Sequence, residues 1–516
     1  MIYFLLVDRF ANGDLGNDGS VDASDPQAFH GGDLAGVVAH LPELRRMGVD
    51  TLWLGPIAKM RDTPFHGHGA FHGYWTEDLA ALEPRFGTTA DLAGLVAAAE
   101  ASDIGLVVDM VYNHVAPDHA WVTERPLWFH KTGAIGNWDD PIEVVTHRVH
   151  GLPDLAQENP EVYDWLLASS RSWLAAVRPV ALRFDAVRHM GGDFLRRAGS
   201  DLRAGAPGLE LWGEVFDGNV RTVLDSRDAA GLDAVFDFPL HYAIRDVVCD
   251  GGLAAAIPAV IDRAAHVPSS AWITFLDNHD TPRITTVCHD EPDRVDAALD
   301  LLFTLRGRPM ISWGTEWGAR GAGEPDNRAD MKWAWRNPIE QIAHLQRVSR
   351  LTALALSRKA SAALRQGSSR TLQLGSDWFV IERESGDDRR WVVYNGGVSP
   401  LSGAWPEPVP AGSVGVFDAK KLRLRAKPVR AGMTKILAAG APPLAPGDSL
   451  RLVGSAAALG DWQPQAGISL PTRLELDATA KTFKLVIVHA DGRVTWAPGP
   501  NQWKLGGGGS LTVSWS

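Results

Sequence analysis

The sequence has few cysteines, few tyrosines, no long apolar run and no excess of basic residues. Its two cysteines, Cys249 and Cys288, are too few for a disulfide framework or a four-cysteine zinc site, and whether they form one bridge or two buried thiols stays open. No run of about 20 apolar residues exists, so no membrane-spanning segment is predicted. The start MIYFLLVDRF lacks a basic region and a cleavage site, so it is typical of a strand from residue 2 and not of a secretory signal.

Charge and composition narrow the class of protein further. The chain has 62 acidic against 50 basic residues, which gives a net charge of −12 over 516 residues. So acidic a chain is a poor binder of phosphate backbones, and no nucleic-acid partner is expected. Hydrophobic residues make up 45% of the sequence, which excludes a disordered chain. The 20 tryptophans against 6 tyrosines provide large flat side chains, either for the core or for stacking on ligands.

Short apolar segments alternate with helical periodicity up to about residue 345. Eight such segments are found, at 2–7, 50–55, 104–110, 180–186, 208–214, 233–237, 271–276 and 309–314. Between them, 33–47 and 88–100 carry apolar residues at helical spacing, the latter behind a capping-box pattern at Thr88 and Asp91. Apolar strands that alternate with amphipathic helices predict a parallel sheet, and eight units predict a (β/α)8 TIM barrel. A doubly wound open sheet is the alternative, but no glycine-rich phosphate turn follows the first strand.

The remaining pattern predicts the domain organisation. A catalytic barrel is expected over 1–345, with a small subdomain inserted after the third strand at about 115–157, because that connection is too long for one helix. Alternating strands separated by turn residues predict a small antiparallel β-domain over 346–417. Apolar alternation continues over 418–516 and predicts a β-sandwich.

Several acidic residues follow directly after predicted strands. In a (β/α)8 barrel, the active site lies at this carboxyl end of the strands. The acidic residues are Asp109, Asp185, Glu214, Asp277 and Asp280. Arg183 lies two residues before Asp185, on the same face of the strand, where it can hold that carboxylate ionised. Glu214 follows the apolar segment LELWG, so burial is expected to raise its pKa. One ionised carboxylate and one protonated carboxylic acid are the pair that a glycosidase uses.

Four segments resemble the signature motifs of the α-amylase superfamily: DMVYNH (109–114), LRFDAVRH (182–189), LWGEV (211–215) and FLDNHD (275–280). Four others resemble its minor motifs: GPI (55–57), HGYW (72–75), LPDL (152–155) and GTEWG (314–318). The resemblance implies that Asp185 is the nucleophile, Glu214 the general acid/base and Asp280 the third carboxylate. It also implies ten residues around the sugar: His72, Tyr74, Trp75, His114, Arg183, Arg188, His189, His279, Glu324 and Arg328.

The activity that this resemblance implies is retaining hydrolysis of α-1,4-glucosidic bonds in starch and maltooligosaccharides, through a covalent glycosyl-enzyme. An α-1,4-glucanotransferase or cyclodextrin-acting enzyme of the same family is the alternative, with the same chemistry and another acceptor. An inactive glucan-binding protein is a remote alternative, because all three carboxylates are present. A monomer is expected, and its action on starch favours an extracellular location for a chain that would be a mature or trimmed form.

Two places predict Ca²⁺. The segment NGDLGND (12–18) offers oxygen ligands and glycine-permitted turns, which suit calcium, although a polar turn without metal has the same composition. With the later GGD it resembles a calcium loop of cyclodextrin glucanotransferases, which implies the ligands Asn12, Asp14, Asn17, Asp18, Gly31 and Asp33. The resemblance to α-amylases implies a second ion at Asn113, Asp154 and the main-chain carbonyl of His189.

The last segment contains two tryptophans beside predicted turns, in LGDW (459–462) and VTWAPGPNQ (494–502). Such indoles can either belong to the core or stack on sugar rings. The pattern over 418–516 resembles the starch-binding module of glucoamylases and amylases. This resemblance implies one sugar site formed by Trp462, Lys484, Trp496 and Asn501.

Overall fold

The computed structural model describes residues 1–335 and 337–419, and the backbone of eight further strands between 434 and 514. The chain divides into two compact units. The first comprises Met1–Arg245 and His266–Ser368, and the second comprises Asp246–Ala265 and Ser369–Ser516. A search of the described residues for a helix that is long and apolar enough to cross a membrane finds none.

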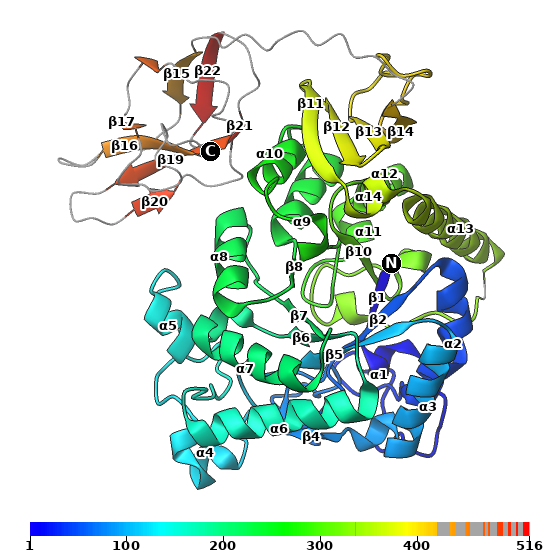
Figure 1. Ribbon diagram of the computed structural model, residues 1–516, viewed down its shortest axis with the longest axis vertical. Helices are drawn as coiled ribbons and strands as arrows, with labels where there is room; N and C mark the ends of the chain where they lie inside the picture. The colour runs from blue at the N-terminus through cyan, green and yellow to red at the C-terminus, as the bar shows by residue number, and fades with distance from the viewer. Residues whose placement is uncertain are drawn as a thin grey trace. The chain divides into compact units, whose positions relative to one another are not determined.

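In the first unit, eight parallel strands close into a barrel in the order β1-β10-β9-β8-β7-β6-β5-β2 (Figure 1). They are β1 (Ile2–Leu5), β2 (Thr51–Leu54), β5 (Gly105–Met110), β6 (Ala181–Phe184), β7 (Glu210–Gly213), β8 (Ala234–Phe236), β9 (Trp272–Thr274) and β10 (Arg308–Ser312). Each predicted apolar segment overlaps one of these strands, so the predicted TIM barrel is confirmed. Nearly every strand residue is buried, because one face packs inside the barrel and the other beneath the helices.

Helices cover the outside of the barrel: α2 (Leu34–Met47), α3 (Thr89–Ala101), α6 (Pro160–Val177), α7 (Gly192–Gly205), α8 (Val220–Ala230), α12 (Pro292–Thr304) and α13 (Pro338–Ala360). They contact one another in the order α12-α13-α2-α3-α6-α7-α8. Local sequence sets their ends. Asp33 caps α2 by accepting from the N–H of Gly36, Gly48 ends it at a φ of 99°, and Thr88 with Asp91 forms the predicted capping box of α3.

The segment after β5 has little regular structure, with α4 (Trp121–Glu124) and α5 (Pro141–Thr146) as short helices. Isolated bridges pair His114 with Asp154 and Phe129 with Leu155, which close this segment back onto the barrel before α6. Short elements complete the unit: β3 (Ala58–Met60), β4 (Thr76–Leu82), α1 (Val7–Phe10), α9 (Phe238–Ile244), α11 (Ile284–Val287) and α14 (Ala362–Gln366). The domain boundary expected at residue 345 falls inside α13, since the helix after the last strand belongs to the outer layer of the barrel.

The second unit contains α10 (Ala256–Arg263) and a four-stranded sheet, β11 (Ser368–Leu374), β12 (Trp378–Ser385), β13 (Asp388–Asn395) and β14 (Ser413–Asp418). The β12–β13 and β13–β14 pairs are antiparallel, as predicted for this region. A core around Val380, Trp391, Trp405 and Phe417 supports the sheet. Cys249 and Cys288 are both disulfide-bonded, which settles the alternative that the sequence leaves open.

The described residues of 418–516 include eight further strands, in the segment where the sequence predicts a β-sandwich. They are β15 (Thr434–Ala439), β16 (Ser449–Gly454), β17 (Ile468–Ser469), β18 (Arg473–Leu474), β19 (Thr482–Val488), β20 (Val494–Trp496), β21 (Gln502–Trp503) and β22 (Gly509–Ser514). One sheet has the order β18-β15-β22, and another has β16 and β19 at its centre.

Candidate active site

The register of the barrel strands brings two carboxylates to the same level. Phe184 of β6 is paired with Gly213 of β7, and the next residues along the two strands are Asp185 and Glu214. The N–H of Glu214 still donates to the carbonyl oxygen of Phe184 at 3.0 Å, so the ladder continues one residue beyond the strand. Asp185 and Glu214 therefore leave neighbouring strands side by side at the carboxyl end of the barrel.

Arg183 connects three carboxyl groups. Its Nη1 lies 2.9 Å from Oδ1 of Asp109 and 2.8 Å from Oδ1 of Asp185, and its Nη2 lies 3.0 Å from Oε2 of Glu214. The side chain of Arg183 is 1% exposed, so the cluster is shielded from water. Because one cation faces three buried acids, the cluster favours keeping a proton on one of them.

Burial opposes the ionisation of both Glu214 and Asp185. It raises the pKa of Glu214 to about 7 and that of Asp185 to about 6, while the charge of Arg183 opposes both increases. The neighbouring carboxylates raise both pKa values further. Near neutral pH, Asp185 is therefore mostly ionised while a large share of Glu214 is protonated, as the sequence predicts.

Asp109 supports the cluster from inside the barrel. Its Oδ2 accepts from the hydroxyl of Tyr74 at 2.9 Å and from the indole N–H of Trp53 at 3.2 Å. The guanidinium of Arg183 lies 5.0 Å from the ring centre of Trp53. Burial raises the pKa of Asp109, against the charge of Arg183. These contacts fix the position of Arg183, and through it that of the other two carboxyl groups.

Asp280 has different partners. His279 Nε2 lies 3.0 Å from Oδ2 of Asp280, and Nη2 of Arg328 lies 3.1 Å from Oδ1. Burial alone would raise the pKa of Asp280, but the contacts with His279 and Arg328 hold it well below its usual value. Asp280 is therefore ionised throughout the neutral range. Arg328 also pairs with Glu324 at 2.6 Å, so these two expected residues lie beside the third carboxylate.

Aromatic and histidine rings line the same region. The ring of Tyr74 stacks on His279 at 4.9 Å and on His72 at 5.9 Å, and Trp75 meets the edge of His72. His114 donates through Nε2 to the carbonyl oxygen of Tyr74 at 3.0 Å. Burial lowers the pKa of His114 to about 4 and that of His72 well below its usual value. Both rings are therefore neutral at the pH where the acid pair is in its working state.

Arg188 and His189 lie farther out, against the inserted segment. Arg188 donates to the carbonyl oxygen of Trp138 at 3.1 Å and lies 3.3 Å from a carboxylate oxygen of Asp217. His189 donates through Nδ1 to the carbonyl oxygen of Val144 at 3.0 Å. The contacts with Trp138 and Val144 hold the inserted segment to the turn that follows β6.

The structure adds residues that the sequence does not single out. Trp53 is part of an apolar strand, where a tryptophan is indistinguishable from any other core residue. Asn327 donates to the carbonyl oxygen of His279 at 2.8 Å, although its sequence context is an ordinary polar turn. Trp138 and Phe216 are 48% and 45% exposed. The position of Phe216, two residues after Glu214, was the one signal in the sequence that could have identified it.

The residues of the predicted calcium loop are arranged around the carboxylate of Asp33. The carboxylate of Asp33 accepts from the N–H groups of Gly13 at 3.0 Å and Asp14 at 2.7 Å. Gly31 approaches the side chains of Asn12 and Asp18 so closely that a Cβ would lie 2.6 Å and 2.8 Å from their polar atoms.

The oxygen atoms of this loop fit a hard cation. Oδ1 of Asn17 is buried and has no hydrogen-bond partner among the described residues, which leaves it available as a ligand. Two other predicted ligands already accept hydrogen bonds within the loop: Asp14 from the N–H of Gly16 at 2.9 Å, and Oδ1 of Asp18 from the side-chain amide of Asn12 at 2.7 Å.

The second predicted calcium position also contains unused oxygens. Oδ1 of Asn113 and Oδ1 of Asp154 are buried and have no hydrogen-bond partner in the part of the chain that the structure describes, while Oδ2 of Asp154 lies 2.6 Å from Nδ1 of His130. Among the described residues, no group of three or more His, Cys, Asp or Glu side chains could hold a metal ion. A cation at either place would therefore use amide and main-chain oxygens together with carboxylates, as calcium does.

The four predicted sugar-binding residues belong to the segment 418–516. Trp462 and Asn501 lie outside the described residues. Lys484 lies in β19 and Trp496 in β20, for which the backbone pairing alone is described, with Trp496 opposite Val486. The sugar site of this module stays a prediction.

A (β/α)8 barrel with buried acids at the carboxyl ends of its strands is typical of glycoside hydrolases. Comparison with known proteins agrees with that class. Residues 4–127 and 137–350 match the family described as "Alpha amylase, catalytic domain", and residues 440–510 match the "Starch binding domain". The chain belongs to the alpha-amylase family of glycoside hydrolases and transferases, and carbohydrates are its substrates.

Individual relatives show which activities occur among similar chains. A cyclomaltodextrin glucanotransferase of Klebsiella oxytoca is 29% identical over 77% of this chain and 70% of its own length. A beta/alpha-amylase of Paenibacillus polymyxa is 30% identical over 76% of this chain but 33% of its own length. The crystal structure of an alpha-amylase from Geobacillus thermoleovorans in complex with acarbose has a TM-score of 0.70 and 30% identity, and it covers 81% of this chain and 95% of its own.

Replacement of Arg183 by methionine should change the pH dependence of activity as well as its size. Without the guanidinium, the pKa of Asp185 rises, so the acidic limb of the pH profile of kcat/KM should move to higher pH. We expect kcat/KM to fall by about a hundredfold or more. Arg188→Met, outside the cluster, should leave the acidic limb in place. An unchanged acidic limb in Arg183→Met would contradict the role given to this cation.

Proposed function

We propose that this chain hydrolyses α-1,4-glucosidic bonds in starch and maltooligosaccharides with retention of the anomeric configuration. The observation that supports this most directly is that the two terminal nitrogens of Arg183 contact Asp185 and Glu214. One guanidinium keeps the two carboxyl groups near each other, and retaining enzymes need a separation of about 5 Å, shorter than that of inverting enzymes.

In the first step, Glu214 acts as the acid and Asp185 as the nucleophile. An Oδ atom of Asp185 attacks the anomeric carbon while the proton of Glu214 passes to the glycosidic oxygen. The bond from the anomeric carbon to that oxygen breaks, and its electron pair stays on the oxygen of the departing sugar. The products are a glycosyl ester of Asp185 and an ionised Glu214.

In the second step, the carboxylate of Glu214 acts as a base. It accepts a proton from water as the water oxygen attacks the anomeric carbon, and the bond to Asp185 breaks with its electron pair returning to the carboxylate. Both acids regain their initial protonation states. Two displacements at one carbon give overall retention.

Asp280 and the rings around it position the sugar. Because Asp280 is ionised, it can accept hydrogen bonds from sugar hydroxyl groups. The neutral rings of His72 and His114 add contacts that do not compete for the proton of Glu214. Tyr74 offers its ring for stacking beside them.

Transfer to a sugar acceptor is the second candidate function, because one relative is a cyclomaltodextrin glucanotransferase. A sugar hydroxyl would replace water in the second step, with Glu214 as the same base. The exposed rings of Phe216 and Trp138 offer surfaces on which an acceptor could stack. Products from maltoheptaose separate the two functions, since hydrolysis gives shorter chains and transfer gives longer or cyclic ones.

Asp185→Asn should abolish turnover of maltoheptaose, because the amide is a poor nucleophile of nearly the same size. We expect kcat to fall at least about a thousandfold, with an unchanged melting temperature. Asp228→Asn, at an exposed position, serves as the control and should behave like the unmodified protein. Proton NMR of the first products should show the α-anomer. Activity of Asp185→Asn within tenfold of the unmodified protein, or β-anomeric products, would refute the proposed mechanism.

The proposal includes two calcium ions, one held by the loop around Asp33 and the other by Asn113, Asp154 and the main-chain carbonyl of His189. Their role would be to hold the first loop and the inserted segment in place, without a part in bond cleavage. The oxygens of Asn17, Asn113 and Asp154 that lack hydrogen-bond partners support this assignment.

Removal of calcium should lower the melting temperature. At a hundredfold excess of Ca²⁺ over Kd, one site adds about 2.7 kcal/mol to the free energy of unfolding. Scanning calorimetry should therefore show a lower melting temperature in EDTA, restored by Ca²⁺ and not by the same concentration of Mg²⁺. Asp18→Ala should show a smaller shift. Equal melting temperatures in EDTA and in Ca²⁺ would remove both sites.

Two features support action on starch outside the cell. The starch-binding domain over 440–510 would attach the enzyme to insoluble substrate. The disulfide-bonded state of both cysteines is typical of proteins that work in oxidising surroundings.

A further inference from the structure

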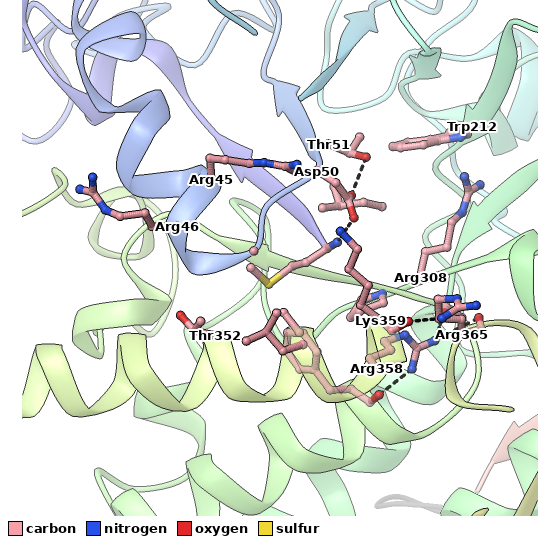
Figure 2. A pocket seen from close by; sticks show the side chains of 18 residues that line it. Arg45, Arg46, Asp50, Thr51, Trp212, Arg308, Thr352, Arg358, Lys359 and Arg365 are labelled. Carbon is pink, nitrogen blue, oxygen red and sulfur yellow. Dashed lines mark hydrogen bonds and ion pairs between the residues drawn. The ribbon is translucent and has the colours of Figure 1, made fainter. Parts of the chain in front are cut away.

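A cavity of about 730 Å³ lies at the amino end of the barrel, opposite the carboxylates (Figure 2). It is bounded by the first residues of β1, β2 and β10, by the end of α2, and by α13 with α14. All of these elements belong to the first unit. The proposed catalytic function makes no use of this cavity.

Basic side chains dominate its lining: Arg45, Arg46, Arg308, Arg358, Lys359 and Arg365. Among the described lining residues, Asp50 is the one acid. Figure 2 shows Arg45 and Arg46 on one side of the cavity and the other four cations on the opposite side. Such a concentration of positive charge is unexpected in a chain with a net charge of −12.

Half of these cations have a carboxylate partner. Arg45 pairs with Asp103, Arg46 with Glu43, and Arg308 with Glu210. The other half, Arg358, Lys359 and Arg365, form no ion pair with a carboxylate in the part of the chain that the structure describes. Three positive charges around one cavity are therefore not neutralised by the protein.

Arg358 is the clearest case, because it is 6% exposed. Its guanidinium donates to the carbonyl oxygens of Phe303 at 2.6 Å and Leu305 at 3.1 Å, and to that of Gly307. These bonds engage its two terminal nitrogens but provide no counter-charge. Burial, and then the charge of Arg365, lower the pKa of Arg358 to about 9. An anion in the cavity would offset that unfavourable charge.

The lining also contains apolar side chains, among them Trp212, Phe303 and Leu356. The guanidinium of Arg308 lies 4.8 Å from the ring centre of Trp212, so cationic and flat apolar surfaces meet there. A ligand that fits both has a strongly anionic group and an apolar body. A phosphoryl group matches three cations without carboxylate partners better than a single carboxylate does, and guanidinium groups bind it with paired hydrogen bonds.

We propose that this cavity binds a phosphorylated small molecule, with the phosphoryl group beside Arg358, Lys359 and Arg365 and the body against Trp212 and Leu356. The site is separate from the active site, so its occupancy can be tested without substrate.

The test is calorimetric titration of the full chain with inorganic phosphate, phenyl phosphate and phenol at constant ionic strength. Phenyl phosphate should bind more tightly than inorganic phosphate, and phenol should not bind. In the double variant Lys359→Ala/Arg365→Ala, the affinity for phenyl phosphate should fall about tenfold or more. The control Arg178→Ala/Arg320→Ala removes the same charge from exposed positions elsewhere and should keep the original affinity.

Melting temperature and activity on maltoheptaose show whether each variant is folded, and both should match the unmodified protein. If the double variant does not fold, Lys359→Glu reverses one charge at an exposed position and should also abolish binding of phenyl phosphate. Equal affinity in the unmodified, double-variant and control proteins would overturn the proposal. So would the absence of binding of both phosphates to the unmodified protein.

Discussion

The guanidinium of Arg183 is the interaction on which the rest of the active site depends. It is the single buried cation in direct contact with Asp109, Asp185 and Glu214 among the described residues. The barrel makes this contact possible, because its register sets the carboxyl ends of β5, β6 and β7 level with one another. One positive charge faces three acids, and burial raises the pKa of Glu214 to about 7, so a large share of Glu214 holds a proton near neutral pH. The difference in protonation between Glu214, the proposed acid, and Asp185, the proposed nucleophile, thus follows from strand register and burial.

Much of this arrangement could be predicted from the sequence, because the residues that end a strand or cap a helix lie close together along the chain. The eight apolar segments locate the barrel strands, and the acids after them locate the cluster. The chemistry of Trp53 could not be predicted, since its indole N–H contacts Asp109 on the neighbouring strand, far from it in the sequence. The exposure of Phe216 depends equally on packing with a distant segment, at Phe238. The roles of Asp185, Glu214 and Asp280 remain predictions that geometry supports and activity must test.

The two ends of the barrel differ in charge. Acidic residues lie at the carboxyl ends of the barrel strands. Arginine and lysine line the cavity at the amino ends, to which the α-helices return the chain. At the first end, buried charges face one another and the protein neutralises part of them itself. At the other end, Arg358 donates to main-chain carbonyl oxygens and has no carboxylate partner among the described residues, so its charge is left for a ligand to neutralise. The same barrel thus provides a reaction site and a separate anion site.

The most direct test of the central claim follows fluoride release from α-maltosyl fluoride by Glu214→Gln across pH, since fluoride leaves without a proton from the enzyme. In the unmodified protein, activity on maltoheptaose should fall as pH rises through about 7, where Glu214 loses its proton, and as pH drops through about 6, where Asp185 gains one. Glu214→Gln should give a burst of fluoride whose rate falls as pH drops through about 6 but does not fall as pH rises through about 7. An alkaline limb that persists in Glu214→Gln, or the absence of any burst, would contradict the assignment of Glu214 as the acid and Asp185 as the nucleophile.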